Sequence, residues 1–274
     1  MRLHIRHETV YTYETPATRA TETLRLTPRG HDGQFIVNWR IDVDRDVHLD
    51  HAVDPFGNSV HSFTAEGPLD GLTIVAGGNV ETQETNGTLS GQIERFPPVL
   101  FLRDTALTTS DESIRAFADT TAAATGSGGR LALLHNLTDA VKERIAFDAD
   151  ATNTGSAAID AFRLGHGVCQ DLAHIYITAA RHLGIPARYA SGYLYDSERQ
   201  KPHAGHAWAE AFVEDLGWVG FDATNGMCPT ESYVRLAVGL DYLGAAPVRG
   251  VHYGGSGEKL AVRVTITPGG RGGR

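Results

Sequence analysis

Residues 165–184 read GHGVCQDLAHIYITAARHLG, which is a glycine-containing loop followed by a pattern typical of an amphipathic helix. Cys169 comes directly after the loop. The apolar residues that share one face of the predicted helix are Leu172, Tyr176, Ala179 and Leu183. Gly184 and Pro186 form a typical C-terminal stop. We therefore expect Cys169 in the first turn of a helix that starts near Val168 and ends at Gly184.

A cysteine in the first turn of a helix can act as a nucleophile. Unpaired backbone N–H groups and the positive end of the helix dipole stabilise its thiolate, which is the reactive form. The same N–H groups can hold an oxyanion. A free cysteine is more commonly a small buried hydrophobe, so the position of Cys169 by itself leaves both interpretations open.

Three strand-like runs follow the helix, over residues 187–195, 206–213 and 217–222. His206 begins the second run, and imidazole is well suited to exchange a proton with a thiol near neutral pH. If the second and third runs form a hairpin, Asp222 lies near the start of the His206 strand. Its carboxylate can then accept the second imidazole N–H. The predicted nucleophile, base and orienting residue are therefore Cys169, His206 and Asp222.

Several blocks of sequence around these residues resemble the bacterial transglutaminase-like superfamily. The blocks cover residues 167–174, 184–189, 191–194, 206–208 and 217–226, and the resemblance extends over about residues 156–253. The β-rich region before them is similar to the segment that often precedes this core in bacterial members. The resemblance implies a papain-like core with Cys169 as nucleophile, His206 as base and Asp222 as its orienting residue. It also implies amide hydrolysis by a cysteine-peptidase route, or transfer of an acyl group to an amine.

The sequence departs from the patterns of related proteins at several places. No tryptophan lies between Trp39 and Trp208, so the tryptophan that helps to hold the oxyanion in animal transglutaminases has no counterpart upstream of Cys169. Arg163 stands where papain-type peptidases have a glutamine. The side chain that would assist the backbone N–H of Cys169 is therefore not identified. Leu240 stands where many bacterial relatives have arginine, and no calcium-binding loop is visible in the sequence.

The whole chain predicts an α+β fold with two parts. Residues 1–100 alternate apolar and polar side chains between turn signals, which favours an N-terminal antiparallel β domain. Residues 101–257 form the predicted papain-like catalytic domain of helices packed on an antiparallel sheet, with one helix expected over residues 130–147. Residues 258–268 are predicted to form a C-terminal strand, and residues 269–274 a disordered tail.

Composition and charge exclude several classes of protein. Hydrophobic residues make up 41% and charged residues 21% of the chain, which is typical of a folded globular protein. Lys and Arg number 24 against 33 Asp and Glu, and the net charge of −9 argues against nucleic acid as a partner. No apolar run reaches the roughly 18 residues of a membrane span, and the N-terminus lacks the pattern of a secretory signal. We therefore expect no membrane association and a cytoplasmic location.

We expect no metal and no cofactor, although a metal site is an alternative. The ligand-type side chains in this region are Cys169, Asp171, His174, His203 and His206. A strand places His203 and His206 on opposite faces, and the thiol chemistry needs His206 beside the sulfur. Asp171 is more readily explained as structural support for the loop, and Cys228 as a packing or surface thiol.

The leading hypothesis is thiol-dependent amide chemistry through an acyl-thioester on Cys169. Hydrolysis of a peptide, isopeptide or glutamine-type amide is favoured, because water is always available and no second-substrate site is identified. Transfer of the acyl group to an amine acceptor uses the same three residues and is an alternative. Two further alternatives are a non-catalytic module that binds a protein or peptide, and a metal-dependent hydrolase. The sequence predicts neither the substrate-binding residues nor the oligomeric state.

Overall fold

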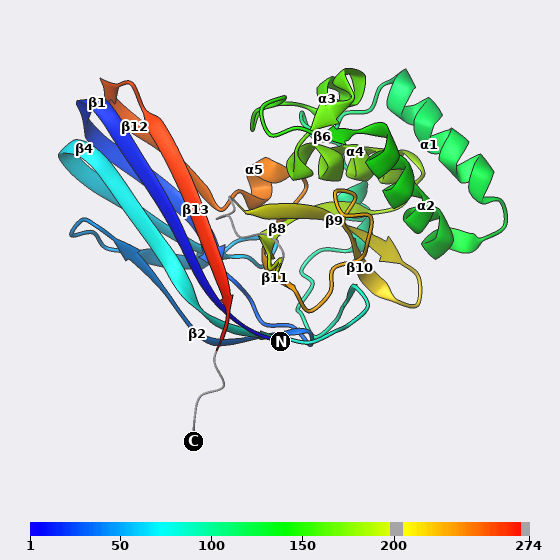
Figure 1. The fold of residues 1–274 in the computed structure, drawn as a ribbon, viewed down its shortest axis with the longest axis horizontal. Coiled ribbons are helices and arrows are strands. Elements are labelled where there is room, and N and C mark those ends of the chain that lie inside the picture. Colours follow the sequence, from blue (N-terminus) through cyan, green and yellow to red (C-terminus); the bar gives the residue numbers. More distant parts are fainter. Residues whose placement is uncertain (198–204, 270–274) are drawn as a thin grey trace.

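The N-terminal part of the fold is a large antiparallel sheet, which forms the layer at the left of Figure 1. The computed structural model describes residues 1–197 and 205–269, and within them this sheet has six strands. The strands are β1 (Arg2–Thr27), β2 (Gln34–Val43), β3 (Asp50–Val53), β4 (Ser59–Thr82), β12 (Val248–Ser256) and β13 (Lys259–Pro268). β1 lies between β4 on one side and β12 and β13 on the other. The predicted N-terminal antiparallel β region is confirmed.

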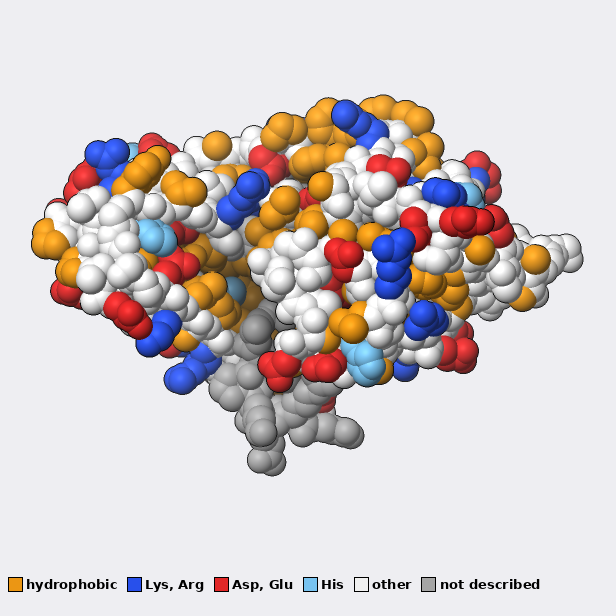
Figure 2. Space-filling view, turned by 90° about the horizontal axis from the view of Figure 1, so that it is seen from above, with side chains coloured by type: hydrophobic (Ala, Val, Ile, Leu, Met, Phe, Trp, Pro, Cys, Tyr) orange, Lys and Arg blue, Asp and Glu red, His pale blue; other side chains and the backbone are white. Residues whose placement is uncertain are grey.

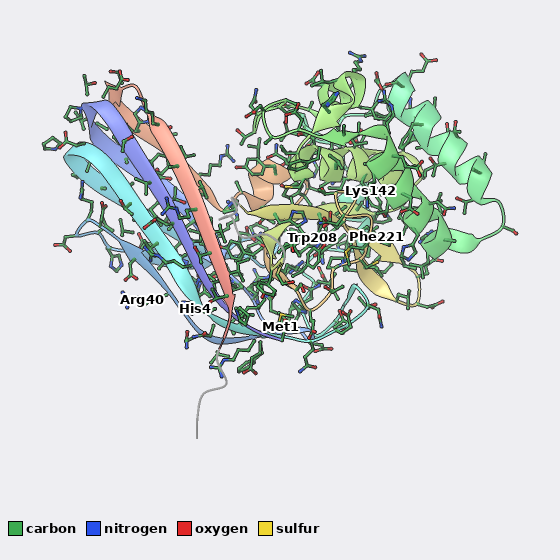
Figure 3. The ribbon with its side chains drawn as sticks, viewed as in Figure 1. Met1, His4, Arg40, Lys142, Trp208 and Phe221 are labelled. Carbon is green, nitrogen blue, oxygen red and sulfur yellow. The ribbon has the colours of Figure 1, made fainter. Side chains whose placement is uncertain are left out.

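Alternation along β1 decides which side of this sheet is buried. Leu3, Ile5 and His7 are buried, whereas the intervening His4 and Arg6 are exposed to solvent. Successive residues of a strand point to opposite faces of a sheet, so this pattern gives one core-facing side and one solvent-facing side. Figure 3 shows His4 near Arg40 of β2, close to the N-terminal end of the sheet.

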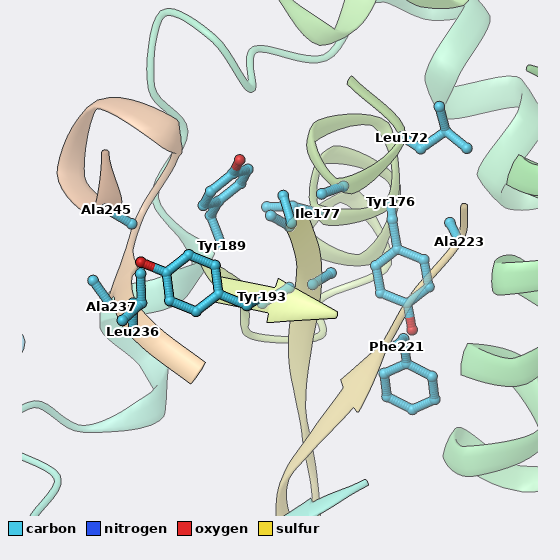
Figure 4. Packing of buried hydrophobic residues seen from close by; sticks show 14 of the residues in the cluster. Leu172, Tyr176, Ile177, Tyr189, Tyr193, Phe221, Ala223, Leu236, Ala237 and Ala245 are labelled. Carbon is cyan, nitrogen blue, oxygen red and sulfur yellow. The ribbon is translucent and has the colours of Figure 1, made fainter. Parts of the chain in front are cut away.

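A second antiparallel sheet forms the centre of the other part of the molecule. Its strands, in spatial order, are β11 (Tyr233–Gly239), β8 (Ala187–Leu194), β9 (His206–Val213), β10 (Gly217–Phe221) and β5 (Thr88–Leu89). Helix α4 (Cys169–His182) packs on β8 and β9 with its predicted apolar stripe inward. Tyr176 of that stripe stacks on Phe221 of β10, with ring centroids 5.5 Å apart (Figure 4). Together these elements form the predicted papain-like α+β core.

Several further helices complete this part. They are η1 (Pro98–Leu102), α1 (Glu112–Thr125), α2 (Gly129–Arg144), α3 (Ala158–Leu164) and α5 (Tyr242–Ala245). The helix expected over residues 130–147 ends earlier than predicted, because Ile145 has an extended backbone. The next two residues form β6 (Ala146–Phe147), which pairs with β7 (His166–Gly167) just before Cys169. The short pairing therefore fixes the loop that leads into α4.

Two side-chain amides join the two parts, and each makes a pair of hydrogen bonds with the backbone of one residue in the other part. The Asn58 amide donates to the Val238 carbonyl at 2.7 Å and accepts from the Val238 N–H at 2.8 Å. Gln34 makes the same double contact with the backbone of Arg235, at 2.9 and 2.8 Å.

Seen from above, the surface is hollowed between the N-terminal sheet and the helix-bearing part, and hydrophobic side chains gather there (Figure 2).

The chain returns to the N-terminal sheet at Val248. β12 pairs with the second half of β1, from Thr15 opposite Ser256 to Leu24 opposite Val248. The predicted catalytic domain, residues 101–257, includes β12, whereas the structure pairs β12 with β1 of the N-terminal sheet. The glycines at positions 250, 254 and 255 interrupt the apolar alternation of this stretch, which is why the sequence did not indicate a strand there.

A buried ionic network holds the strands of the central sheet together. The Arg188 guanidinium bonds Glu210 at 2.6 Å and Glu94 at 2.8 Å, and it lies 3.9 Å from the ring centre of Trp218. Arg235 bonds the same Glu210 at 2.6 Å. Burial raises the pKa of Glu210, but the charges of Arg235 and Arg188 outweigh burial and lower it to about 2. Glu210 is therefore ionised, and it depends on both arginines.

We predict that Arg188→Met lowers the free energy of unfolding by about 3–5 kcal/mol, because it leaves a buried carboxylate without one of its partners. Urea denaturation measures the loss. Arg19→Met is the matched control, because Arg19 pairs with Glu66 at 3.0 Å on the surface, where an ion pair contributes about 0–1 kcal/mol. Equal losses in the two variants would contradict the role given to the buried network.

Candidate active site

Cys169 is the first residue of α4, as the sequence predicts. The loop before it is held by Asp171, whose buried Oδ2 accepts the Val168 N–H at 2.8 Å and the Thr152 hydroxyl at 2.6 Å. Gly167 is needed for this approach, because a Cβ at that position would lie 2.8 Å from the Asp171 Cβ. Asp171 therefore supports the loop. Cys169 is half-buried at the start of the helix, where its backbone N–H has no partner within the helix.

His206 and Asp222 lie together beside this helix start. The hairpin of β9 and β10 pairs Phe221 with Ala209, and Asp222 follows directly after β10. Nε2 of His206 donates to Oδ2 of Asp222 at 2.6 Å. Since Nε2 is occupied in this way, Nδ1 is the ring nitrogen that faces the hydrogen-bonded thiol of Cys169. The structure thus brings the three predicted residues together.

The electrostatics of this cluster favour a charged imidazole. Burial lowers the pKa of His206, but the hydrogen bonds to Asp222 and Cys169 and their charges outweigh burial and raise it to about 10. Burial likewise raises the pKa of Asp222, yet the hydrogen bond and the charge of His206 hold it below its ordinary value. An imidazolium beside a carboxylate is therefore the stable form over the whole neutral range.

Asp222 is fully buried and receives hydrogen bonds on both of its oxygens. Oδ1 accepts the backbone N–H groups of Thr224 and Asn225 at 2.9 and 3.2 Å. Oδ2 accepts the Tyr233 hydroxyl at 2.7 Å and the Asn225 amide at 2.6 Å in addition to His206. These donors fix the carboxylate in position and stabilise its negative charge.

Two further side chains support the cluster from a distance. Lys142 of α2 donates to the Asn225 carbonyl at 2.7 Å and so anchors the turn after β10 (Figure 3). Trp208 lies on the same side of β9 as His206, with ring centroids 6.2 Å apart, and it packs edge-on against Tyr233. Trp208 is buried, which makes it a packing residue.

The sequence did not identify Tyr233 or Asn225 as part of the site. Asn225 follows Asp222 closely enough for a turn to be expected, and the pattern Asp-Ala-Thr-Asn-Gly is typical of turns in which the aspartate accepts local N–H groups. Tyr233 carried no comparable signal. It reaches Asp222 only because β11 lies in the same sheet as β10, which is a long-range arrangement.

The other predicted candidates have structural roles or lie outside the described residues. Nε2 of His174 accepts the Tyr242 N–H at 3.0 Å, and burial lowers the pKa of this histidine to about 4. Arg163 is exposed and pairs with Asp111 at 2.9 Å. His203 lies outside the described residues. Among residues 1–197 and 205–269, no group of three or more His, Cys, Asp or Glu side chains is arranged to hold a metal ion.

Comparison with known families agrees with this arrangement. Residues 116–223 match the transglutaminase-like superfamily, and residues 3–81 match the bacterial transglutaminase-like N-terminal region. An uncharacterized protein of Mycobacterium leprae is 32% identical, over 97% of this chain and 98% of the relative. The chain belongs to the transglutaminase-like superfamily.

A second sequence relative and a solved structure also match nearly the whole chain. An uncharacterized protein of Mycobacterium bovis is 25% identical, and the match covers 97% of this chain and 93% of the relative. A crystal structure from Cytophaga hutchinsonii, described as a candidate cysteine protease, superposes with a TM-score of 0.77 at 19% identity, over 97% of this chain and 90% of that one. This transglutaminase-like protein therefore shares its whole two-part architecture with a solved structure.

Membership of the transglutaminase-like superfamily supports thiol-dependent amide chemistry in general terms. No helix within the described residues is both long enough and apolar enough to cross a membrane.

Proposed function

We propose that this protein hydrolyses amide bonds through an acyl-thioester on Cys169. The observation that carries the proposal is the position of His206, whose ring bonds Asp222 at one nitrogen and faces the thiol with the other. An imidazolium in this position stabilises the neighbouring sulfur as a thiolate. A thiolate at a helix N-terminus is a strong nucleophile, and the same imidazolium is a ready proton donor.

The first half of the proposed reaction forms the thioester. The Cys169 thiolate attacks the amide carbonyl carbon, and the carbonyl oxygen becomes an oxyanion beside the first-turn N–H groups. His206 then donates its proton to the amide nitrogen. The C–N bond breaks, the amine leaves, and the acyl group stays on the sulfur while His206 becomes neutral.

The second half regenerates the enzyme. Neutral His206 takes a proton from a water molecule, whose oxygen attacks the thioester carbonyl. The C–S bond breaks, the carboxylic acid leaves, and the thiolate–imidazolium pair forms again. Asp222 holds the imidazole in one orientation throughout and stabilises its charged form. The proposed substrate is a peptide, isopeptide or glutamine-type amide.

The reactivity of Cys169 tests the proposal, and Cys228 provides an internal control. We predict that iodoacetamide alkylates Cys169 at a rate that changes less than about twofold between about pH 6 and about pH 8, because a charged His206 beside the sulfur favours the reactive thiolate. The pKa of His206, about 10, lies above this window, so the imidazolium is present throughout it. Burial raises the pKa of Cys228, so its rate is expected to rise about tenfold per pH unit. Mass spectrometry reads each site separately.

His206→Ala separates the proposed pair from an intrinsically reactive thiol. The variant is expected to give Cys169 the same steep pH dependence as Cys228, because the imidazolium that stabilises its thiolate is gone. If Cys169 in the unaltered protein already titrates like an ordinary thiol, the proposed nucleophile has no support and a non-catalytic binding role is favoured.

Hydrolysis and acyl transfer differ in their products. p-Nitrophenyl acetate first acetylates the thiolate and releases p-nitrophenolate. When methylamine is present at high concentration and the products of a blank without protein are subtracted, hydrolysis still yields acetate, whereas acyl transfer yields N-methylacetamide. We expect acetate to predominate, and predominant N-methylacetamide would favour the acyltransferase alternative.

A further inference from the structure

Tyr189 lies on β8, next to the strand that carries His206. Strand pairing sets Tyr189 opposite Ala209 of β9, on the side of the sheet that faces α4. Its ring is packed between His174 of α4 and Tyr242 of α5, with centroid distances of 5.1 and 6.1 Å. The ring is therefore held rigidly beneath the first turns of the helix that begins at Cys169.

The Tyr189 hydroxyl has no partner in the described part of the chain. Only 2% of the residue is exposed, and the hydroxyl oxygen is not sealed from solvent. Other buried tyrosines of this part are satisfied: Tyr176 donates to the Leu134 carbonyl, Tyr193 bonds His7, and Tyr233 donates to Asp222. Figure 4 shows Tyr189 and Tyr193 on the same strand with hydroxyls that point in different directions. A nearly buried donor without a partner is costly unless another molecule accepts from it.

The Tyr189 ring packs on His174 of α4, the helix whose first residue is Cys169. After burial, the charge of Cys169 is the leading influence that raises the pKa of Tyr189 above its ordinary value. The phenol therefore stays protonated at neutral pH and can only be a donor toward a nearby anion. Tyr189 lies on the helix-facing side of β8, whereas His206 is at the start of β9. A base and an oxyanion donor need to approach the reacting carbonyl from different directions in this way.

Two side-chain amides of this region are already engaged. The Gln170 amide donates to the Thr154 carbonyl at 3.3 Å, and the Asn225 amide donates to Asp222 at 2.6 Å. We propose that the Tyr189 hydroxyl, together with the backbone N–H of Cys169, donates a hydrogen bond to the oxyanion formed when the thiolate attacks a carbonyl. This inference rests on the proposed function and supplies the side-chain donor that the sequence left unidentified.

Two reactions of the same sulfur separate this role from a structural one. Acetylation by p-nitrophenyl acetate passes through a tetrahedral oxyanion, since the S–C bond forms before the C–O bond to p-nitrophenolate breaks. Alkylation by iodoacetamide displaces iodide at a saturated carbon and forms no oxyanion. Tyr189→Phe is expected to lower the acetylation rate of Cys169 by about 100-fold and to leave its alkylation rate unchanged.

Tyr242→Phe is the matched control, because it removes the neighbouring hydroxyl from the ring that packs against Tyr189. We expect it to change neither rate, and both variants to keep the thermal unfolding midpoint of the unaltered protein within a few degrees.

Equal losses of acetylation and alkylation in Tyr189→Phe would overturn the inference and give Tyr189 a structural role. An unchanged acetylation rate would overturn it as well. If Cys169 of the unaltered protein is alkylated rapidly at low pH but forms no acetyl-thioester, the proposed function itself fails, and that result is seen before any variant is made.

Discussion

Replacement of Cys169 by alanine is expected to abolish protein-dependent turnover of p-nitrophenyl acetate, a loss of about 10³-fold or more. The reason is that covalent catalysis begins at this sulfur, and no other nucleophile faces His206 among the contacts of the described residues. The measurement is the release of p-nitrophenolate against a blank without protein. Intact-mass spectrometry then shows whether an acetyl group is retained.

Cys228→Ala is the control for this experiment. Cys228 is also a half-buried free thiol, but it lies against Gly87 and not beside His206. Turnover is expected to stay within about twofold of the unaltered protein in this variant, since the residue touches none of the three reacting groups. Retention of full turnover in Cys169→Ala would refute the proposed mechanism and favour the non-catalytic alternative.

Replacement of Asp222 by asparagine is expected to lower turnover by about 10⁴-fold, the second large effect. An amide in this position no longer stabilises the imidazolium, and its NH₂ group opposes the Nε2–H of His206. The same change places an NH₂ group or an uncharged oxygen against the Asn225 amide and the Tyr233 hydroxyl, which donate to Asp222. The free energy of unfolding is therefore expected to fall as well. The test is p-nitrophenyl acetate turnover at a temperature where the variant is fully folded by circular dichroism.

A second aspartate–histidine pair offers the control for Asp222→Asn. Asp119 of α1 accepts from Nε2 of His182 at 2.9 Å, but its carboxylate is largely exposed and far from α4's first turn. Asp119→Asn is expected to leave turnover unchanged. If it reduced turnover as much as Asp222→Asn, or if Asp222→Asn had no effect, the orienting role given to Asp222 would be wrong.

Local patterns in the sequence were sufficient to predict the main elements of the fold. The apolar stripe of residues 165–184 predicted α4 and placed Cys169 at its start, because helix amphipathicity and end signals depend on neighbouring residues. The alternation of residues 206–213 and 217–222 predicted the hairpin that sets Asp222 beside His206. Both predictions need only contacts between residues close in sequence.

Long-range packing decided the parts that were not predicted. Tyr233 joins Asp222 because β11 and β10 belong to one sheet, and no spacing rule connects the two positions. Tyr189 was visible only as an alternating residue of a strand, and its free hydroxyl follows from the helices that pack around the ring. Arg188 was likewise part of a strand pattern, yet its partners Glu94 and Glu210 come from other segments.

The pairing of β1 with β12 and β13 has a consequence for synthesis of the chain. Leu3 lies opposite Pro268, so β1 pairs with a segment that is synthesised long after it. Until the C-terminal segment has emerged, β1 has an open edge that can pair with other chains. Contacts of such wide sequence separation also form slowly, because a long loop has to close first. The N-terminal sheet therefore reaches its final form only after β12 and β13 have emerged, while the segment that carries Cys169, His206 and Asp222 can assemble earlier.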